Sequence, residues 1–185
     1  LWKLDLIVGS GGVLSHAPRR IQSMLMMVDA YQPLGVPRLS VDSIFMMPHL
    51  GVLSTVSEKA AADVFDRDCM VYLGTCLAPQ GTGKPGAPCL EVRLKGETHA
   101  VPFGELKLLP LPPEDEADLE ALPSRGFDLG AGSGKPLKVR VKGGVAGLLI
   151  DCRGRPLALS EDPKVRVGQL GRWFRAVGMY PEAGA

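Results

Sequence analysis

The chain has 185 residues, of which 45% are hydrophobic and 22% are charged, and its formal net charge is +1. This composition is typical of one or two globular domains and excludes a disordered chain. The near-neutral charge, the scattered basic residues and the 5% of aromatic residues argue against nucleic acid or an anionic membrane as a partner.

Other absent signals narrow the class of protein further. No apolar run reaches the ~20 residues that a transmembrane helix needs, and no secretory signal precedes the first predicted strand. The four cysteines form no C-x-x-C pair and the three histidines lie far apart, so we expect buried free thiols rather than a zinc site, and a cytoplasmic location. Since the chain starts with Leu1, directly in an apparent strand, we expect the C-terminal part of a longer protein.

The first predicted element is a buried strand over residues 4–8, a continuous apolar run. Gly9, Ser10, Gly11 and Gly12 follow it, and a helix comes next. Ser15 is a candidate N-cap for this helix, which has one apolar face formed by Ile21, Met24, Leu25 and Val28.

A strand, a glycine turn and a helix start bring the backbone close to a phosphate or a nucleotide. A tight turn without a ligand has the same pattern, which on its own favours that simpler interpretation. His16 lies in the same loop, where it either faces a ligand or only begins the helix.

Residues 38–41 are the next predicted strand, and Asp42 or Ser43 can cap the helical stretch that follows. Pro48 interrupts this stretch, which predicts two helices or one kinked helix up to residue 65. The order strand, helix, strand, helix is typical of a parallel or mixed sheet with helices packed on it.

The pattern changes at about Arg67, where short strand patterns replace helical periodicity. The strands are expected near residues 70–76, 89–95, 98–103, 106–111, 117–122, 137–142 and 145–151. An amphipathic helix over residues 165–177 closes the chain. Many short strands with one terminal helix predict a small barrel or sandwich.

The remaining motifs in the sequence yield no catalytic residue and no metal ligand. Residues 128–136 contain Gly-Lys but lack the other positions of a phosphate-binding P-loop, so a hairpin loop is expected. Asp151, Arg153 and Arg155 flank a turn, for which we favour solvated charges at a strand end over an anion site or a docking corner. No nucleophile lies beside a base in any known motif.

Residues 8–24 resemble the second adenosine-binding motif of the actin, heat-shock chaperone and sugar-kinase ATPases. The resemblance implies that Gly9, Ser10, Gly11 and Gly12 contact adenosine. Five residues separate Gly12 from Pro18, one more than in the chaperones, so side-chain contacts are not transferred.

A more specific resemblance covers nearly the whole chain. Residues 42–51, 74–79, 108–113 and especially 143–157 (GGVAGLLIDCRGRPL) are similar to the C-terminal part of the MutL/GlmL family. These glutamate mutase accessory proteins are unrelated to the mismatch-repair protein of the same name. The resemblance implies a cytoplasmic, actin-like ATPase fold and ATP-driven release of damaged cobalamin from adenosylcobalamin-dependent mutases.

The phosphate loops of that superfamily, an Asp-x-Gly-x-Thr loop and a second phosphate loop, do not occur in these 185 residues. The resemblance therefore implies that ATP or ADP, with Mg²⁺, is bound by the full-length parent. This chain by itself is expected to bind nucleotide weakly and not to hydrolyse it. Its expected partners are the mutase subunits and the upstream half of its own ATPase domain.

We thus predict an α+β fold with two domains. Residues 1–66 are expected to be the C-terminal part of an actin-like (ribonuclease H-like) ATPase lobe, and residues 67–185 a family-specific, strand-rich domain that docks on the mutase. The predicted function is part of an ATP-dependent reactivating chaperone. The alternatives are a non-catalytic scaffold module with a purely structural glycine turn, and a kinase or acyl-phosphate enzyme.

Overall fold

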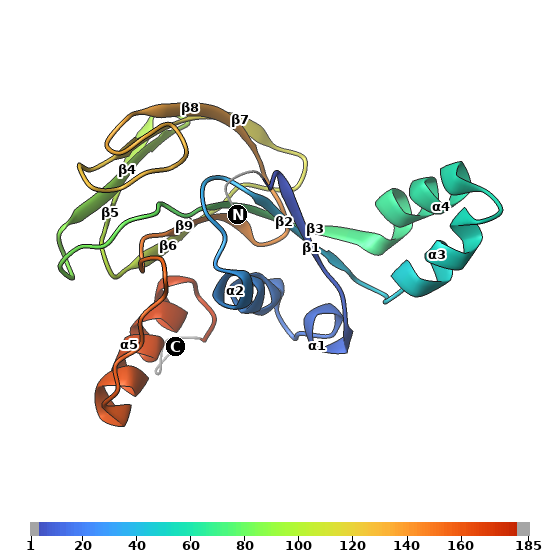
Figure 1. Ribbon diagram of the computed structural model, residues 1–185, viewed down its shortest axis with the longest axis horizontal. Helices are drawn as coiled ribbons and strands as arrows, with labels where there is room; N and C mark the ends of the chain where they lie inside the picture. The colour runs from blue at the N-terminus through green and yellow to red at the C-terminus, as the bar shows by residue number, and fades with distance from the viewer. Residues whose placement is uncertain (1–3, 181–185) are drawn as a thin grey trace.

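The computed structural model describes residues 4–180, which fold into three layers (Figure 1). One layer is helical, and the other two are a five-stranded and a four-stranded sheet. The elements are β1 (Leu6–Gly9), α1 (Gly12–Ser15), α2 (Arg20–Tyr31), β2 (Arg38–Asp42), α3 (Met47–Ser54), α4 (Glu58–Val64), the π-helical turn η1 (Phe65–Cys69), β3 (Met70–Leu77), β4 (Pro88–Leu94), β5 (Glu97–Pro102), β6 (Leu106–Leu109), β7 (Glu116–Pro123), β8 (Leu137–Lys142), β9 (Gly147–Asp151) and α5 (Pro163–Ala176).

The five-stranded sheet has the order β1-β2-β3-β9-β6. The pairs β1–β2 and β3–β9 are parallel, whereas β2–β3 and β6–β9 are antiparallel. Strands from both sides of residue 66 therefore share one sheet, and we describe the chain by its sheets. The division into domains at residues 66 and 67 stays a prediction.

The four-stranded sheet, with the order β5-β4-β7-β8, is antiparallel throughout. Along each strand, successive side chains alternate between the two faces of the sheet. Val92 of β4 and Leu119 of β7 face the first sheet and share a core with Leu148 and Ile150 of β9. The α+β class and most predicted strands are confirmed. Two packed sheets agree with the predicted sandwich arrangement, although one of them also contains the N-terminal strands.

Helices α2 and α5 cover the other face of the first sheet (Figure 1). The predicted apolar face of α2 is confirmed, because Met24, Leu25 and Val28 are buried against β2 and β3. Trp173 of α5 is buried in the same core. The first sheet thus has apolar layers on both faces, as expected of strands with continuous apolar sequences.

Two predicted helix boundaries are wrong. Ser15 does not cap α2, because it lies in the separate turn α1 and its Oγ donates to the Gly11 carbonyl at 3.1 Å; Arg19 and Gln22 form the start of α2 instead. Pro48 does not interrupt a helix, because it lies in the first turn of α3, where a missing N–H costs nothing.

Helices α3 and α4 and the turn η1 form a helical arm that projects from the ends of β2 and β3 (Figure 1). The N-cap of α3 is Met46 rather than the predicted Asp42 or Ser43, but the Asp42 carboxylate still accepts hydrogen bonds from the Met46 and Met47 amides at 3.1 and 2.9 Å. The arm has its own small core of Leu50, Ala61 and Cys69.

We expect Gly74→Ala to destabilise the protein strongly, because Gly74 has a φ of +139° and a Cβ there would overlap the Gly147 carbonyl in the neighbouring strand. Strain and overpacking together should cost about 3 kcal/mol or more. Urea unfolding followed by Trp173 fluorescence measures this cost.

The matched control is Gly96→Ala in the β4–β5 turn, where φ is also positive but no atom lies within 4 Å of a Cβ. Backbone strain alone should cost about 1 to 2 kcal/mol there. Equal losses of stability in the two variants would contradict the close approach of β3 and β9.

Candidate functional site

The predicted glycine turn lies at the carboxyl ends of two neighbouring parallel strands. Gly9 ends β1 and pairs with Val41, next to Asp42 at the end of β2. Ser10 Oγ lies 3.4 Å from Asp42 Oδ2 and donates to it. The carboxyl edge of parallel strands is where open α/β sheets bind ligands, so the turn occupies a suitable place for a ligand site.

Different structural features explain why a glycine occupies each of the three positions in the turn. Gly9 is buried, and a Cβ there would lie 2.7 Å from Leu14 Cδ1, so close packing of the Leu14 and Met27 side chains favours a glycine. Gly11 has a φ of +120°, and no atom lies within 4 Å of a Cβ at Gly11 or Gly12. Only the outer side of the turn, at Gly11 and Gly12, therefore leaves open space beside the backbone.

The helix that follows the turn is very short. The Gly11 carbonyl accepts the Leu14 and Ser15 amides at 3.1 and 3.0 Å, and α1 ends at Ser15. A single turn sums too few peptide dipoles to form an anion site at its N-terminus. We therefore assign no phosphate group to α1.

His16 is exposed, and its Nδ1 lies 2.9 Å from Ser15 Oγ and 3.1 Å from the Gly12 carbonyl oxygen. Local hydrogen bonds thus hold the imidazole beside the glycine turn. The ring lines the groove described next, so His16 faces a cavity and not only solvent.

A groove of about 530 Å³ begins at Gly12 and runs between α2 and the C-terminal end of α5. Leu25, Met26 and Phe174 make it largely apolar, whereas Gln22 and Asp29 place polar groups along one side. Its size and its mixture of apolar surface with few polar groups are typical of small-molecule sites. Reasoning from sequence missed this groove because α5 lies more than 130 residues beyond α2.

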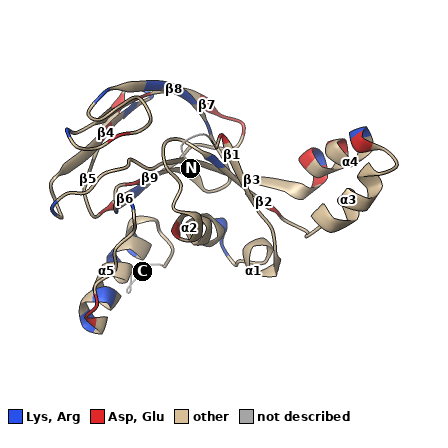
Figure 2. Ribbon diagram, in the orientation of Figure 1, with Lys and Arg blue, Asp and Glu red and all other residues tan. Residues whose placement is uncertain are grey.

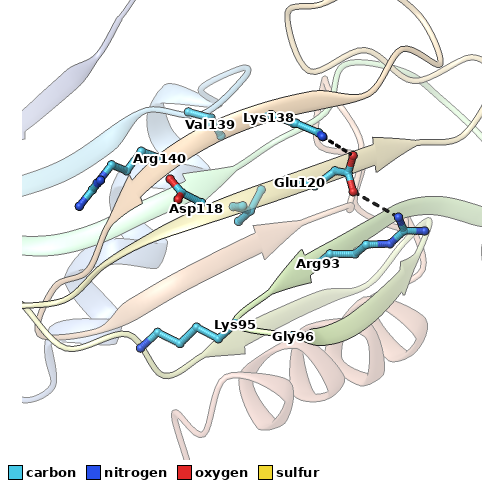
Figure 3. Close-up of a pocket in the computed structure, with 9 residues that line it drawn as sticks. Arg93, Lys95, Gly96, Asp118, Glu120, Lys138, Val139 and Arg140 are labelled. Atoms are coloured by element: carbon cyan, nitrogen blue, oxygen red, sulfur yellow. Dashed lines mark hydrogen bonds and ion pairs between the residues drawn. The ribbon is translucent and has the colours of Figure 1, made fainter.

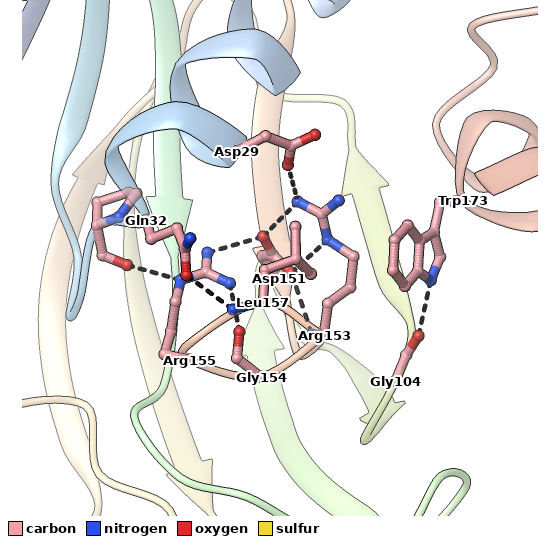
Figure 4. Close-up of polar contacts among 10 residues, drawn as sticks. Asp29, Gln32, Gly104, Asp151, Arg153, Gly154, Arg155, Leu157 and Trp173 are labelled. Carbon is pink, nitrogen blue, oxygen red and sulfur yellow. Dashed lines mark hydrogen bonds and ion pairs between the residues drawn. The ribbon is translucent and has the colours of Figure 1, made fainter. Parts of the chain in front are cut away.

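A buried ion network connects the helices that form the groove to the sheet (Figure 4). The Asp151 side chain is fully buried and accepts hydrogen bonds from Arg153 Nε at 2.9 Å and from Arg155 Nη2 at 2.8 Å. Arg153 Nη2 also donates to Asp29 Oδ1 at 2.6 Å. The prediction of solvated charges at this turn is wrong, because the turn follows an interior strand and lies beneath α2.

The network joins three parts of the fold. Arg155 Nε donates to the Pro33 carbonyl just beyond α2, at 3.2 Å. The Arg153 guanidinium lies 4.9 Å from the ring of Trp173 in α5, whose Nε1 donates to the Gly104 carbonyl (Figure 4). The network therefore connects α2 and α5, which form the two walls of the groove, to β9 of the sheet.

Two carboxylates and two guanidinium groups balance the charge of this network, so it needs no further anion. Burial alone would raise the pKa of Asp151, but Arg153 and Arg155 outweigh it and hold that pKa well below its usual range. Asp151 is therefore a permanently ionised structural group rather than a general acid or base.

A second cavity, of about 520 Å³, lies on the outer face of the four-stranded sheet (Figure 3). Glu120 of β7 pairs with Arg93 of β4 at 3.2 Å and with Lys138 of β8 at 3.6 Å. Such exposed pairs contribute about 0 to 1 kcal/mol each. The lining has four basic and two acidic side chains, and two of the basic ones, Lys95 and Arg140, pair with Asp115 and Glu116 outside it. The cavity therefore presents no concentrated unpaired charge to a ligand.

The structure agrees with two predictions: the cysteines are buried free thiols, and the Gly-Lys segment is a hairpin loop. All four cysteines are free and buried, as expected, and burial raises the pKa of the Cys76 thiol to about 12. Asp128 accepts the Gly130 and Gly132 amides, and the loop leads into strand β8 rather than a helix.

Within residues 4–180, no three potential metal ligands cluster, and no helix could span a membrane.

We expect Asp151→Asn to lower the free energy of unfolding at pH 7 by about 3 to 5 kcal/mol, because it leaves the buried Arg155 guanidinium without an ion-pair partner and Arg153 paired only with the partly exposed Asp29. The pKa of Asp151 is lowered by folding, so its stabilising effect is fully present above about pH 5 and is lost progressively as the pH falls through the unfolded pKa of about 3.9 toward the much lower folded pKa.

Thermal unfolding between pH 3 and pH 7 tests this. The variant should lose less of its remaining stability on acidification than the wild type does. Asp118→Asn, at an exposed carboxylate on β7, is the control and should behave as the wild type. Parallel pH profiles of the wild type and Asp151→Asn would contradict the assignment.

Comparison with known proteins gives one match. Residues 1–69 match the family model described as MutL protein. The matched segment contains the glycine turn, α2, β2 and the helical arm, and it ends directly before β3. No curated protein and no solved structure matches the chain significantly.

Proposed function

We propose that this chain, whose residues 1–69 match the family model described as MutL protein, is part of an ATP-dependent reactivating chaperone for an adenosylcobalamin-dependent mutase. The family indicates a role associated with glutamate mutase. We further propose that the chaperone depends on ATP and releases damaged cobalamin from the mutase.

The proposal assigns the adenosine side of a nucleotide site to Gly9, Ser10, Gly11 and Gly12. The observation that carries it is the open space beside Gly11 and Gly12, where a Cβ would meet no atom within 4 Å. This space adjoins a groove of about 530 Å³, which is large enough for a nucleoside. Gly9 contributes through packing, and Ser10 stays exposed beside Asp42.

The residues present fit the nucleoside better than the phosphates. The α1 turn is too short for an anion site, and the sequence has no phosphate loop. We therefore assign the phosphates and Mg²⁺ to an upstream half of the ATPase. When bound, ATP would supply the free energy of its hydrolysis to the chaperone, and this chain would bind and orient the adenosine.

The first experiment is calorimetric titration with ADP of the protein expressed from its complete natural gene, comparing Gly11→Val with the wild type. A valine at φ +120° would strain the turn and fill the space beside it. We expect at least ~10-fold weaker binding, or about 1.4 kcal/mol.

Gly96→Val is the matched control, because Gly96 also has a positive φ and open space around its Cβ position but lies in the β4–β5 turn. It should bind ADP as the wild type does. A wild-type protein that binds no ADP would favour the alternative of a scaffold module with a structural turn.

We also propose that the four-stranded sheet docks on the mutase, because the described residues beyond β3 contain no cluster of potential metal ligands and no nucleophile beside a base in any known motif. Hydrogen exchange with and without the mutase subunits tests this. Slower amide exchange in β4, β5, β7 and β8 is expected. Slowing confined to the arm, at α3 and α4, would contradict docking through the sheet.

A further inference from the structure

One short motif occurs twice in the chain. Residues 81–85 read Gly-Thr-Gly-Lys-Pro, and residues 132–136 read Gly-Ser-Gly-Lys-Pro. The first copy lies in the loop between β3 and β4 (residues 78–87), and the second lies in the loop between β7 and β8 (residues 124–136). Because β4 and β7 are antiparallel neighbours, the start of β4 and the end of β7 meet at the same end of the sheet. The fold thus places these two Gly-Lys loops side by side.

Both Gly-Lys loops pack on Phe127, which is buried. A Cβ at Gly83 would lie 3.1 Å from the Phe127 ring, and the Gly134 amide donates to the Phe127 carbonyl at 2.8 Å. A lysine follows each of these two glycines, Lys84 in one loop and Lys135 in the other. One buried side chain therefore supports both lysines from below, at two different points.

The positive charges of the Gly-Lys loops lack the partners that the strands provide. Every basic residue on β4 and β8 pairs with a carboxylate: Arg93, Lys138, Arg140 and Lys142. Lys84, Arg125 and Lys135 are exposed in the loops, and none of them forms an ion pair within residues 4–180. Asp128 is the only acidic residue of the two loops, and its Oδ1 accepts two amides of its own loop. The loops therefore present an excess of positive charge.

The backbone holds the two lysines in place. A proline follows each of them, which disfavours a helical backbone at the lysine. The Lys84 carbonyl accepts the Ala87 amide at 3.0 Å, and the Lys135 amide donates to the Gly132 carbonyl at 3.0 Å. Because the loops are already ordered, a partner that binds them pays little conformational entropy.

The chemistry of these loops suits carboxylates on a protein better than other anions. A nucleic acid would need exposed aromatic rings for its bases, whereas Phe127 is buried. A single small anion would need the cations to converge in one cavity, whereas the two lysines start from different sides of Phe127, its ring and its backbone. Exposed cations that are spread over a surface match a second surface with spread negative charge.

We propose that Lys84, Arg125 and Lys135 dock on a carboxylate-rich surface of the mutase; this inference rests on the mutase docking proposed above. Figure 2 shows basic residues in both loops, at the end of the molecule opposite to α3 and α4. The contact thus lies at the loop end of the four-stranded sheet. Exposed charges at an interface act mainly on the rate of association, and salt screens this effect.

The test compares the wild type with Lys84→Glu/Lys135→Glu, in the protein expressed from its complete natural gene, by surface plasmon resonance on immobilised mutase subunits. At about 50 mM salt the variant should associate at least ~10-fold more slowly than the wild type. Between about 50 and about 300 mM salt the wild-type rate should fall by a similar factor, whereas the rate of the variant should not fall. An unchanged association rate in the variant would overturn the proposal.

The matched control is Lys164→Glu/Arg175→Glu, because both residues are exposed on α5 and the change in net charge is the same. It should associate as the wild type does, and an equally slow association would mean that only net charge matters and would overturn the docking surface. Lys84→Arg/Lys135→Arg keeps the charges and should also associate at the wild-type rate. Slow association of this conservative variant would overturn a role for charge at the loops.

Inorganic phosphate tests the chemical class of the partner. At constant ionic strength it should slow association no more than chloride does. Selective inhibition by phosphate would indicate a phosphate site in the loops and would overturn a carboxylate partner.

The results also separate this docking surface from the proposed function. A wild-type protein that binds the mutase, with loop variants that bind equally fast, would refute the docking surface and leave the proposed function intact. A wild-type protein that does not bind the mutase would refute both.

Discussion

The arrangement of this protein depends on one buried carboxylate. Asp151 lies at the end of β9, with no exposed surface, between the guanidinium groups of Arg153 and Arg155. A buried charge is tolerated only when it is paired and hydrogen-bonded, and removing one partner costs several kcal/mol. The ion pairs therefore favour a single relative position of the sheet, of α2 through Asp29, and of α5 through Trp173.

The same network gives the groove its shape, although none of its three central residues lines it. Asp29 is the shared member, since it lies on the groove and also pairs with Arg153. The groove is thus formed by two helices that are distant in sequence and fixed to a common strand. Binding sites of this kind are determined by the supporting contacts as much as by the residues on their surface.

The glycine turn shows how one motif can serve two purposes. Gly9 is a glycine because Leu14 and Met27 occupy the space of its missing side chain. Gly11 is a glycine because its φ is positive, and at the neighbouring Gly12 no atom lies within 4 Å of a Cβ position. Packing explains the first position and backbone geometry the second, so the motif by itself does not establish a ligand, and the proposed nucleotide contact rests on the open space and the adjoining groove.

The sequence by itself determined the local elements. Short strand patterns beyond Arg67 predicted the strands of the four-stranded sheet, and the spacing of Ile21, Met24, Leu25 and Val28 predicted α2, because side-chain periodicity is a local property of the chain. Only the tertiary structure decided that β3 pairs with β2 and brings β9 into the same sheet, that Asp151 is buried, and that α5 meets α2. These features depend on contacts between residues that are distant in the sequence, such as Arg38 with Thr75 and Asp29 with Arg153, and no local pattern encodes such pairing.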